Sequence, residues 1–274
     1  MLEETFVWRD GQHVRWSRHG SGPALVFCHG TPWSSSLWRR TADAFANDFS
    51  VYLWDMVGYG ASTMREDQDV SLAAQSLLLV DLLEHWELTA PDVVAHDYGG
   101  AVSLRAHLLH GASYRSLALV DVVALAPWGS DFFRLVADHA AVFAQLPPSL
   151  HEALVRAYIT GAAHRPLTAE QLDVLAGPWL GADGQAAFYR QIAQANQRYT
   201  DDIEPLLPTI KLPVLIVWGI EDAWIPVDRA HRLAEAIPGS TLRLVPDAGH
   251  LIQLDAPEQL TAILQRWLPA AADS

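Results

Sequence analysis

Asp97 is the residue whose place in the sequence says most about chemistry. It follows the apolar run Val93–Ala95 and precedes Tyr98-Gly99-Gly100, which predicts a strand, a sharp turn at Asp97 and the start of a helix. A carboxylate is a weak nucleophile, better suited to displacing a leaving group from saturated carbon than to attacking an ester. The product is an alkyl ester of the enzyme, which water must hydrolyse. The sequence therefore favours epoxides or carbon–halogen compounds as substrates.

The same turn carries a serine in the G-x-S-x-G nucleophile elbow, where the serine attacks a carbonyl and leaves an acyl-enzyme. In this chain the turn reads His96-Asp97-Tyr98 and offers no hydroxyl at its apex. Cleavage of esters or of C–C bonds is therefore a less favoured alternative. A non-catalytic ligand-binding protein is a further alternative, and an ordinary helix N-cap is a structural role open to Asp97.

Two further residues complete a possible catalytic set with Asp97. Asp222 and His250 each lie in a loop that follows an apolar run. We expect His250 to activate water and Asp222 to orient its imidazole. Glu221 and Asp121 are weaker candidates for the orienting acid.

A loop near the N-terminus can supply backbone donors to the same site. His29-Gly30-Thr31-Pro32 directly follows the apolar run Ala24–Cys28. The N–H groups of Thr31 and Tyr98 are expected to form an oxyanion hole.

These residues need a sheet whose strands end at one edge. Several short runs are apolar throughout, as in parallel strands covered on both faces: Ala24–Cys28, Phe49–Trp54, Asp92–Ala95, Leu117–Val120 and Val214–Trp218. A hairpin is expected from Thr5–Arg9 and His13–Arg18 around Asp10-Gly11. Helical periodicity is present in Leu72–Trp86, Ala101–His110, Arg229–Ile237 and Pro257–Trp267. Alternating strands and helices predict an α/β fold with a doubly wound, mostly parallel sheet.

One long segment breaks this alternation, because no convincing strand falls between Pro127 and Pro205. Four helices are expected there: Phe132–Leu146, Leu150–Thr160, Thr168–Ala176 and Gln185–Arg198, the last preceded by a break at Gly181–Gly184. The predicted division is a core over 1–126 and 206–274, with a helical cap over 127–205. Such a cap would lie over the carboxyl ends of the strands, where open α/β sheets hold ligands.

The composition narrows the partners. The chain has 274 residues and a formal net charge of −14, which argues against nucleic acid and anionic membrane surfaces. Its one cysteine, Cys28, cannot form an internal disulfide. The histidines lack metal-ligand spacing, so no metal and no cofactor are expected. No signal peptide or membrane span is recognisable, which makes a cytoplasmic location the expectation. The expected partners are a small apolar organic substrate and water.

By its motifs the chain resembles the α/β-hydrolase superfamily. Asp55-Met56-Val57-Gly58-Tyr59-Gly60-Ala61-Ser62 is similar to that superfamily's D-x-x-G-x-G-x-S turn, and the nucleophile, acid and base come in its order. His-Asp-aromatic-Gly-Gly at 96–100 and H-G-x-P at 29–32 resemble the aspartate-nucleophile branch, which holds epoxide hydrolases, haloalkane dehalogenases and fluoroacetate dehalogenases. The resemblance implies an α/β-hydrolase core, a helical cap inserted between strands and an alkyl-aspartyl intermediate.

The subtypes of this branch differ in what assists the leaving group. Haloalkane dehalogenases usually have Trp after the nucleophile and Asn or Glu in H-G-x-P, where this chain has Tyr98 and Thr31. Fluoroacetate dehalogenases have Arg after the nucleophile. Epoxide hydrolases use two cap tyrosines; Tyr189 matches one, and His139 lies near the place of the other. We therefore expect an epoxide hydrolase with Tyr189 and His139 as leaving-group donors, and a haloalkane or haloacid dehalogenase as the alternative. Substrate size and oligomeric state remain open.

Overall fold

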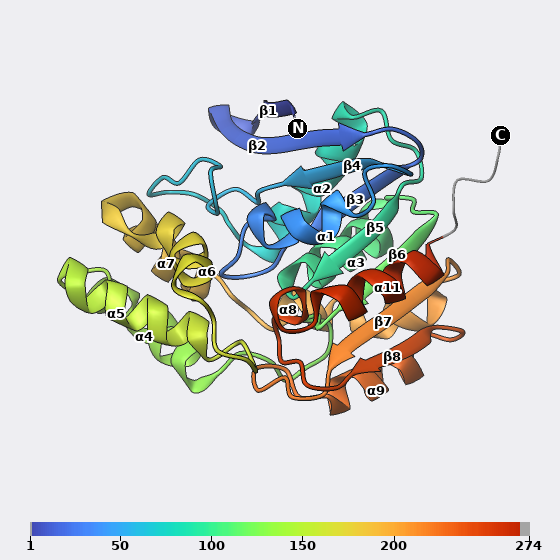
Figure 1. Cartoon of the computed structure of the whole chain (residues 1–274). Coiled ribbons are helices and arrows are strands. Elements are labelled where there is room, and N and C mark those ends of the chain that lie inside the picture. The colour runs from blue at the N-terminus through green and yellow to red at the C-terminus, as the bar shows by residue number, and fades with distance from the viewer. Residues whose placement is uncertain (1, 269–274) are drawn as a thin grey trace.

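Residues 2–268, which the computed structural model describes, form an eight-stranded sheet in the order β1-β2-β4-β3-β5-β6-β7-β8 (Figure 1). The strands are β1 (Leu2–Trp8), β2 (Gln12–Gly20), β3 (Ala24–Cys28), β4 (Ser50–Trp54), β5 (Asp92–His96), β6 (Ser116–Val120), β7 (Val214–Gly219) and β8 (Thr241–Val245). β2 pairs antiparallel with β1 and β4, and the pairs from β4 to β8 are parallel.

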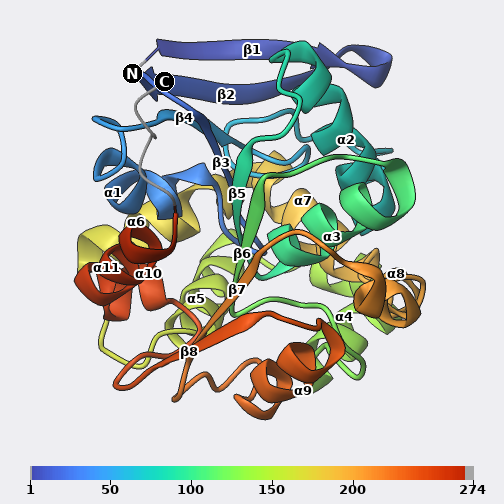
Figure 2. The ribbon, with the colours of Figure 1, turned by 90° about the vertical axis from the view of Figure 1, so that its right-hand side faces the viewer.

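The sequence-based strands are confirmed, each to within a few residues at its ends, and the predicted hairpin is the β1–β2 pair. Continuous apolar runs became central parallel strands because helices cover the sheet on both faces. Figure 2 shows α1 (Arg39–Asp43), α10 (Ile252–Asp255) and α11 (Pro257–Trp267) on one face, and α2 (Leu72–His85), α3 (Tyr98–His110) and α9 (Asp228–Ala236) on the other.

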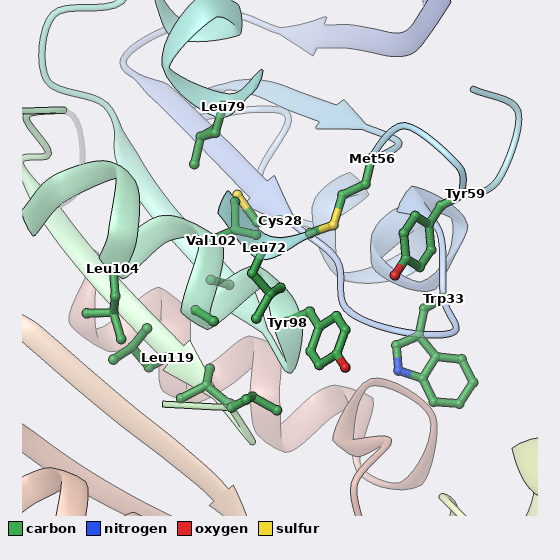
Figure 3. Close-up of a cluster of buried hydrophobic side chains, with 14 of the residues drawn as sticks. Cys28, Trp33, Met56, Tyr59, Leu72, Leu79, Tyr98, Val102, Leu104 and Leu119 are labelled. Carbon is green, nitrogen blue, oxygen red and sulfur yellow. The ribbon is translucent and has the colours of Figure 1, made fainter. Parts of the chain in front are cut away.

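Alternate residues of the central strands serve two separate cores. On β3, Leu25 and Phe27 pack toward α1 and α11, whereas Val26 and Cys28 pack toward α2 and α3. Cys28 is a free, buried thiol surrounded by apolar side chains (Figure 3). Burial raises its pKa to about 11, so the thiol stays protonated and serves as a small core residue.

Helices fill the chain between β6 and β7, and Figure 1 shows α4, α5, α6 and α7 gathered to one side of the sheet. The elements of this segment are α4 (Asp131–Phe143), α5 (Pro148–Thr160), α6 (Ala169–Ala176), η3 (Gly177–Trp179), α7 (Gly181–Ala193), α8 (Arg198–Asp201) and η4 (Glu204–Thr209). The proposed cap boundary at residue 205 falls inside η4. No helix in the described part of the chain is both long and apolar enough to cross a bilayer.

The predicted helix Gln185–Arg198 is wrong at both ends. α7 begins at Gly181, because glycines that read as a break in the sequence form the helix's first turn. A Cβ on Gly184 would lie 2.4 Å from the carbonyl oxygen of Pro178, so a residue without a side chain is needed there. The short elements α1, α8 and α10 were not predicted, since four or five residues are too few to show a helical period.

Candidate active site

Asp97 lies at the turn between β5 and α3 with φ 49° and ψ −119°, a conformation that non-glycine residues rarely adopt. Two glycines make room for this turn. A Cβ on Gly99 would lie 2.6 Å from the carbonyl oxygens of Cys28 and His29, and a Cβ on Gly30 would lie 2.3 Å from the Cβ of Asp97. Asp97 occupies the N-cap position of α3, but its side chain makes no capping hydrogen bond there, so capping is not the role of the carboxylate. The turn instead presents the carboxylate to the loops that follow β3 and β8.

His250 lies between two carboxylates. Its Nδ1 is 2.9 Å from Oδ2 of Asp222, and its Nε2 is 3.4 Å from Oδ2 of Asp97. All three side chains are buried. Oδ1 of Asp222 accepts hydrogen bonds from the backbone N–H groups of Trp224 and Ile225, both at 2.8 Å. Those bonds fix the carboxylate on the side of the imidazole that faces away from Asp97.

The charges around His250 determine its protonation. Burial lowers the pKa of His250, but the charge of Asp222, its hydrogen bond and the nearby charge of Asp97 outweigh burial and raise that pKa well above its ordinary value. The imidazole is therefore an imidazolium in the resting site. It becomes a base when one of the neighbouring negative charges is removed.

Thr31 supplies a backbone donor to Asp97, with its N–H 2.7 Å from Oδ1. The two oxygens of the carboxylate thus have different partners, one facing Thr31 and the other facing His250. Tyr98 is the first residue of α3, so its N–H belongs to the group of helix donors that lack an intrahelical acceptor. This geometry brings the expected oxyanion donors and the Asp97–His250–Asp222 set to one place.

Two buried histidines hold the loops of the site, and sequence reasoning gave them no role. Nε2 of His29 accepts from the backbone N–H of Met56 at 2.9 Å, so its Nδ1 donates to the Gly30 carbonyl at 2.8 Å. Nε2 of His96 lies 2.9 Å from the carbonyl oxygen of His250. Burial and the charge of His250 lower the pKa of His96 to about 3, so neutral His96 donates this bond and anchors the His250 loop.

The weaker candidates for the orienting acid have other partners. Glu221 accepts from the backbone N–H of Ala248 at 3.2 Å. Asp121 is fully buried; its Oδ1 accepts from the N–H of Gly219 at 2.9 Å, and its Oδ2 has no partner within residues 2–268. Burial and the charge of Asp222 raise the pKa of Asp121 well above its ordinary range, so this carboxyl is protonated.

A cavity of about 170 Å³ lies beside Asp97. Its lining is mostly apolar and aromatic, and its polar members include Thr31, Tyr98, Tyr158 and Arg229. The Tyr158 ring stacks on Trp224 with 4.5 Å between ring centroids, and Trp224 lies 5.2 Å from the ring of His250. Tyr158 of α5 therefore packs against Trp224, which in turn lies beside His250.

The predicted leaving-group donors do not line this cavity, which corrects that expectation. Nε2 of His151 lies 2.9 Å from the carbonyl oxygen of Trp179 and must donate a hydrogen bond to it. The other ring nitrogen, Nδ1, lies 2.9 Å from the Tyr189 hydroxyl and therefore accepts a hydrogen bond from it. The Tyr189 hydroxyl therefore already donates its hydrogen bond, to His151 of α5. His139 is exposed on α4, at a kink in that helix.

Tyr98 and Tyr158 stand where those donors were expected. Both line the cavity; Tyr98 is buried and Tyr158 is half-buried. The Tyr98 hydroxyl has no hydrogen-bond partner within residues 2–268. In Figure 3 the nitrogen of the Trp33 indole is on the side of the ring that faces Tyr98, and that N–H also lacks a partner in the same part of the chain. Burial is the main cause that raises the pKa of both tyrosines, and the charge of Asp97 adds to it, so both hydroxyls remain protonated donors.

Comparison with known proteins fits this architecture. Residues 23–257 match the family model described as the alpha/beta hydrolase fold. The chain therefore belongs to the α/β-hydrolase family. A solved alpha/beta hydrolase fold protein from Burkholderia ambifaria is 48% identical, with a TM-score of 0.93, over 96% of this chain and 97% of that one.

More distant relatives carry several activities. Haloalkane dehalogenase 2 of Mycobacterium tuberculosis is 26% identical, over 95% of this chain and 94% of its own length. An esterase from Thermogutta terrifontis is 20% identical with a TM-score of 0.79, over 98% of both chains, a likeness that extends to the fold alone.

Proposed function

We propose that the protein is a hydrolase with an aspartate nucleophile, and that it opens epoxides through an alkyl ester on Asp97. The observation that carries this proposal is the carboxylate of Asp97 at a strained turn, 2.7 Å from the N–H of Thr31 and 3.4 Å from His250. A carboxylate held in this way can attack a saturated carbon in the adjoining cavity. This set of residues supports the aspartate-nucleophile branch of the family as the class of the enzyme.

In the first step a bond forms between an oxygen of Asp97 and an epoxide carbon, and the carbon–oxygen bond of the ring breaks. The ring oxygen leaves as an alkoxide and takes a proton from Tyr98 or Tyr158, which line the same cavity. Both tyrosines are protonated at neutral pH, and an alkoxide is a strong enough base to accept the proton. The tyrosinate then regains a proton that the imidazolium of His250 releases, carried by way of water.

Esterification also changes His250. The charge of Asp97 helps to keep the imidazole protonated, so its neutralisation lowers the pKa of His250 and favours the neutral base. Neutral His250 can take a proton from water, whose oxygen attacks the ester carbonyl while Asp222 stabilises the imidazolium. Collapse of the tetrahedral intermediate breaks the bond between the Asp97 carbonyl carbon and the product oxygen, and the diol leaves with the proton of the new Asp97 carboxyl group, which restores the carboxylate. The N–H groups of Thr31 and Tyr98 bind the oxyanion of this second step.

Dehalogenation is the second candidate. The 26% identity to a protein named haloalkane dehalogenase 2 favours it. A halide is a weak base and needs only N–H or O–H donors. Cleavage of esters or C–C bonds has less support, because the turn carries no hydroxyl.

A trapping experiment tests the shared first step. His250→Gln should still allow alkylation of Asp97 but block release, so intact-protein mass spectrometry should show a stable adduct on the peptide that carries Asp97. The control His250→Gln/Asp97→Asn should show none. Matched 1,2-epoxybutane and 1-chlorobutane, scored for diol and chloride with the unaltered protein, separate the two candidates. An adduct elsewhere in the chain would refute the nucleophile.

A further inference from the structure

The cavity beside Asp97 has one cationic lining residue within the described part of the chain, Arg229. Apart from Asp97, the other lining residues are apolar, aromatic or hydroxyl-bearing, or are glycine. Arg229 comes from the first turn of α9, seven positions beyond Asp222 in the sequence. The cavity therefore has a negative reactive group and a separate positive group on its wall.

The position of Arg229 is not one that helix stability favours. The first turn of a helix carries partial positive charge, so a cation there is less stable than an anion. Asp228 partly offsets this, with Oδ2 3.2 Å from Nη1 of Arg229, but that carboxylate has 60% of its side chain exposed. A guanidinium carries five N–H donors, and this bond uses one of them.

The surroundings of Arg229 keep its charge close to the cavity. Its side chain is 19% exposed. Besides the main cavity it borders a second, much smaller hollow of about 10 Å³, lined by core residues that include Leu125 and Leu233. Packing against such residues restricts the stem, and a half-desolvated guanidinium binds an anion more strongly than one in open water.

From this arrangement we infer that the substrate is a small organic acid, with its reactive carbon at Asp97 and a carboxylate bound by Arg229. A planar guanidinium matches a carboxylate in geometry and can donate two parallel bonds to it. The carboxylate must lie away from Asp97, since like charges repel. A volume of about 170 Å³ suits a ligand with one small ring or a short chain, since an engineered 150 Å³ cavity accommodates benzene.

The inference rests on the proposed function only in taking this cavity as the substrate site. Binding of an unreactive acid therefore tests it without any alkylation. Benzoate and its neutral match benzamide can be titrated calorimetrically into the unaltered protein. We expect benzoate to bind at least about tenfold more tightly, as a charge-assisted hydrogen bond provides.

Variants on α9 locate the effect. Arg229→Gln should weaken benzoate binding about tenfold or more and leave benzamide unchanged, and Arg229→Lys should fall between the two. Asp228→Asn, which removes the competing carboxylate, should tighten benzoate binding. Arg232→Gln is the matched control, because Arg232 bonds the carbonyl of Ala126 outside the cavity. Equal affinities for benzoate and benzamide, or unchanged benzoate binding in Arg229→Gln, would overturn the inference.

A turnover measurement keeps the two proposals apart. 3,4-Epoxybutanoate and 4-chlorobutanoate can be compared with their amides in the unaltered protein and in Arg229→Gln. Alkylation of Asp97 with no preference for the acids would leave the proposed function standing and refute the acid subsite. Arg229-dependent benzoate binding without alkylation by any of the four compounds would do the reverse.

Discussion

Gly30 and Asp97 are so close that a Cβ added to the glycine would lie 2.3 Å from the Cβ of the aspartate and 2.4 Å from its Oδ1. The absence of a side chain at position 30 therefore sets where the carboxylate lies. Gly30 also accepts, through its carbonyl, the bond from Nδ1 of His29, so the loop cannot easily move away. The first prediction concerns this contact.

Gly30→Ala should lower the rate of Asp97 alkylation by about 100-fold or more, because a displacement of about 1 Å at a reacting group has an effect of that size. Alkylation is followed by mass spectrometry in a His250→Gln background. Gly177→Ala is the control, since a Cβ there meets no atom within 4 Å. Equal alkylation rates in the two variants would show that the contact does not position Asp97.

Removing single hydroxyls from the cavity should identify the proton donor. Tyr158→Phe or Tyr98→Phe should slow epoxide opening by about 100-fold while changing ester hydrolysis little. Tyr189→Phe should open epoxides at an unaltered rate, since its hydroxyl donates to His151. Single-turnover quench measurements separate the two steps. A loss confined to Tyr189→Phe would restore the donor expected from the sequence.

Labelled water reports which carbon is attacked. If water attacks the ester carbonyl, one turnover in heavy-oxygen water should place the label in the Asp97 carboxylate and leave the first product mostly unlabelled. Peptide mass spectrometry and product analysis measure the two fractions. Label in the first product with none in Asp97 would mean that water attacks the substrate directly.

The raised pKa of Asp121 predicts how stability depends on pH. Asp121 stays protonated when folded but ionises on unfolding above its unfolded pKa of about 3.9. The unfolded chain then binds fewer protons, so this group lowers the free energy of unfolding by up to about 1.4 kcal/mol per pH unit as pH rises from about 4 toward the folded pKa.

Asp121→Asn replaces this carboxyl with an amide that does not ionise. The unfolding free energy of Asp121→Asn relative to the unaltered protein should therefore increase between pH 4 and pH 7, as measured by urea unfolding. The difference between the two curves at each pH isolates Asp121, because the substitution alters no other ionisable group. A parallel curve for Asp121→Asn would mean that Asp121 is ionised in the folded chain.

The sequence predicted the sheet well because its central strands are apolar throughout, and Asp97 and Asp222 were found because each follows such a strand. His250 was found because it follows β8, an edge strand that reads Thr-Leu-Arg-Leu-Val. Contacts within the cap were not predictable in the same way. Tyr158 and Tyr189 both lie on helices, and neither helix's period tells which ring faces the cavity. The bond between His151 and Tyr189 decides that, and it joins residues 38 positions apart.

Asp97 is held at its turn by demands on the main chain: a positive φ, and clearance for Gly30 and Gly99. None of these depends on the carboxylate as such. The backbone of this turn can therefore persist in evolution while the residue at its apex changes. Exchange of Asp97 for a serine would alter the kind of bond that is cleaved. The fold that α/β-hydrolases share would stay the same, so similarity of fold does not reveal which residue the turn carries.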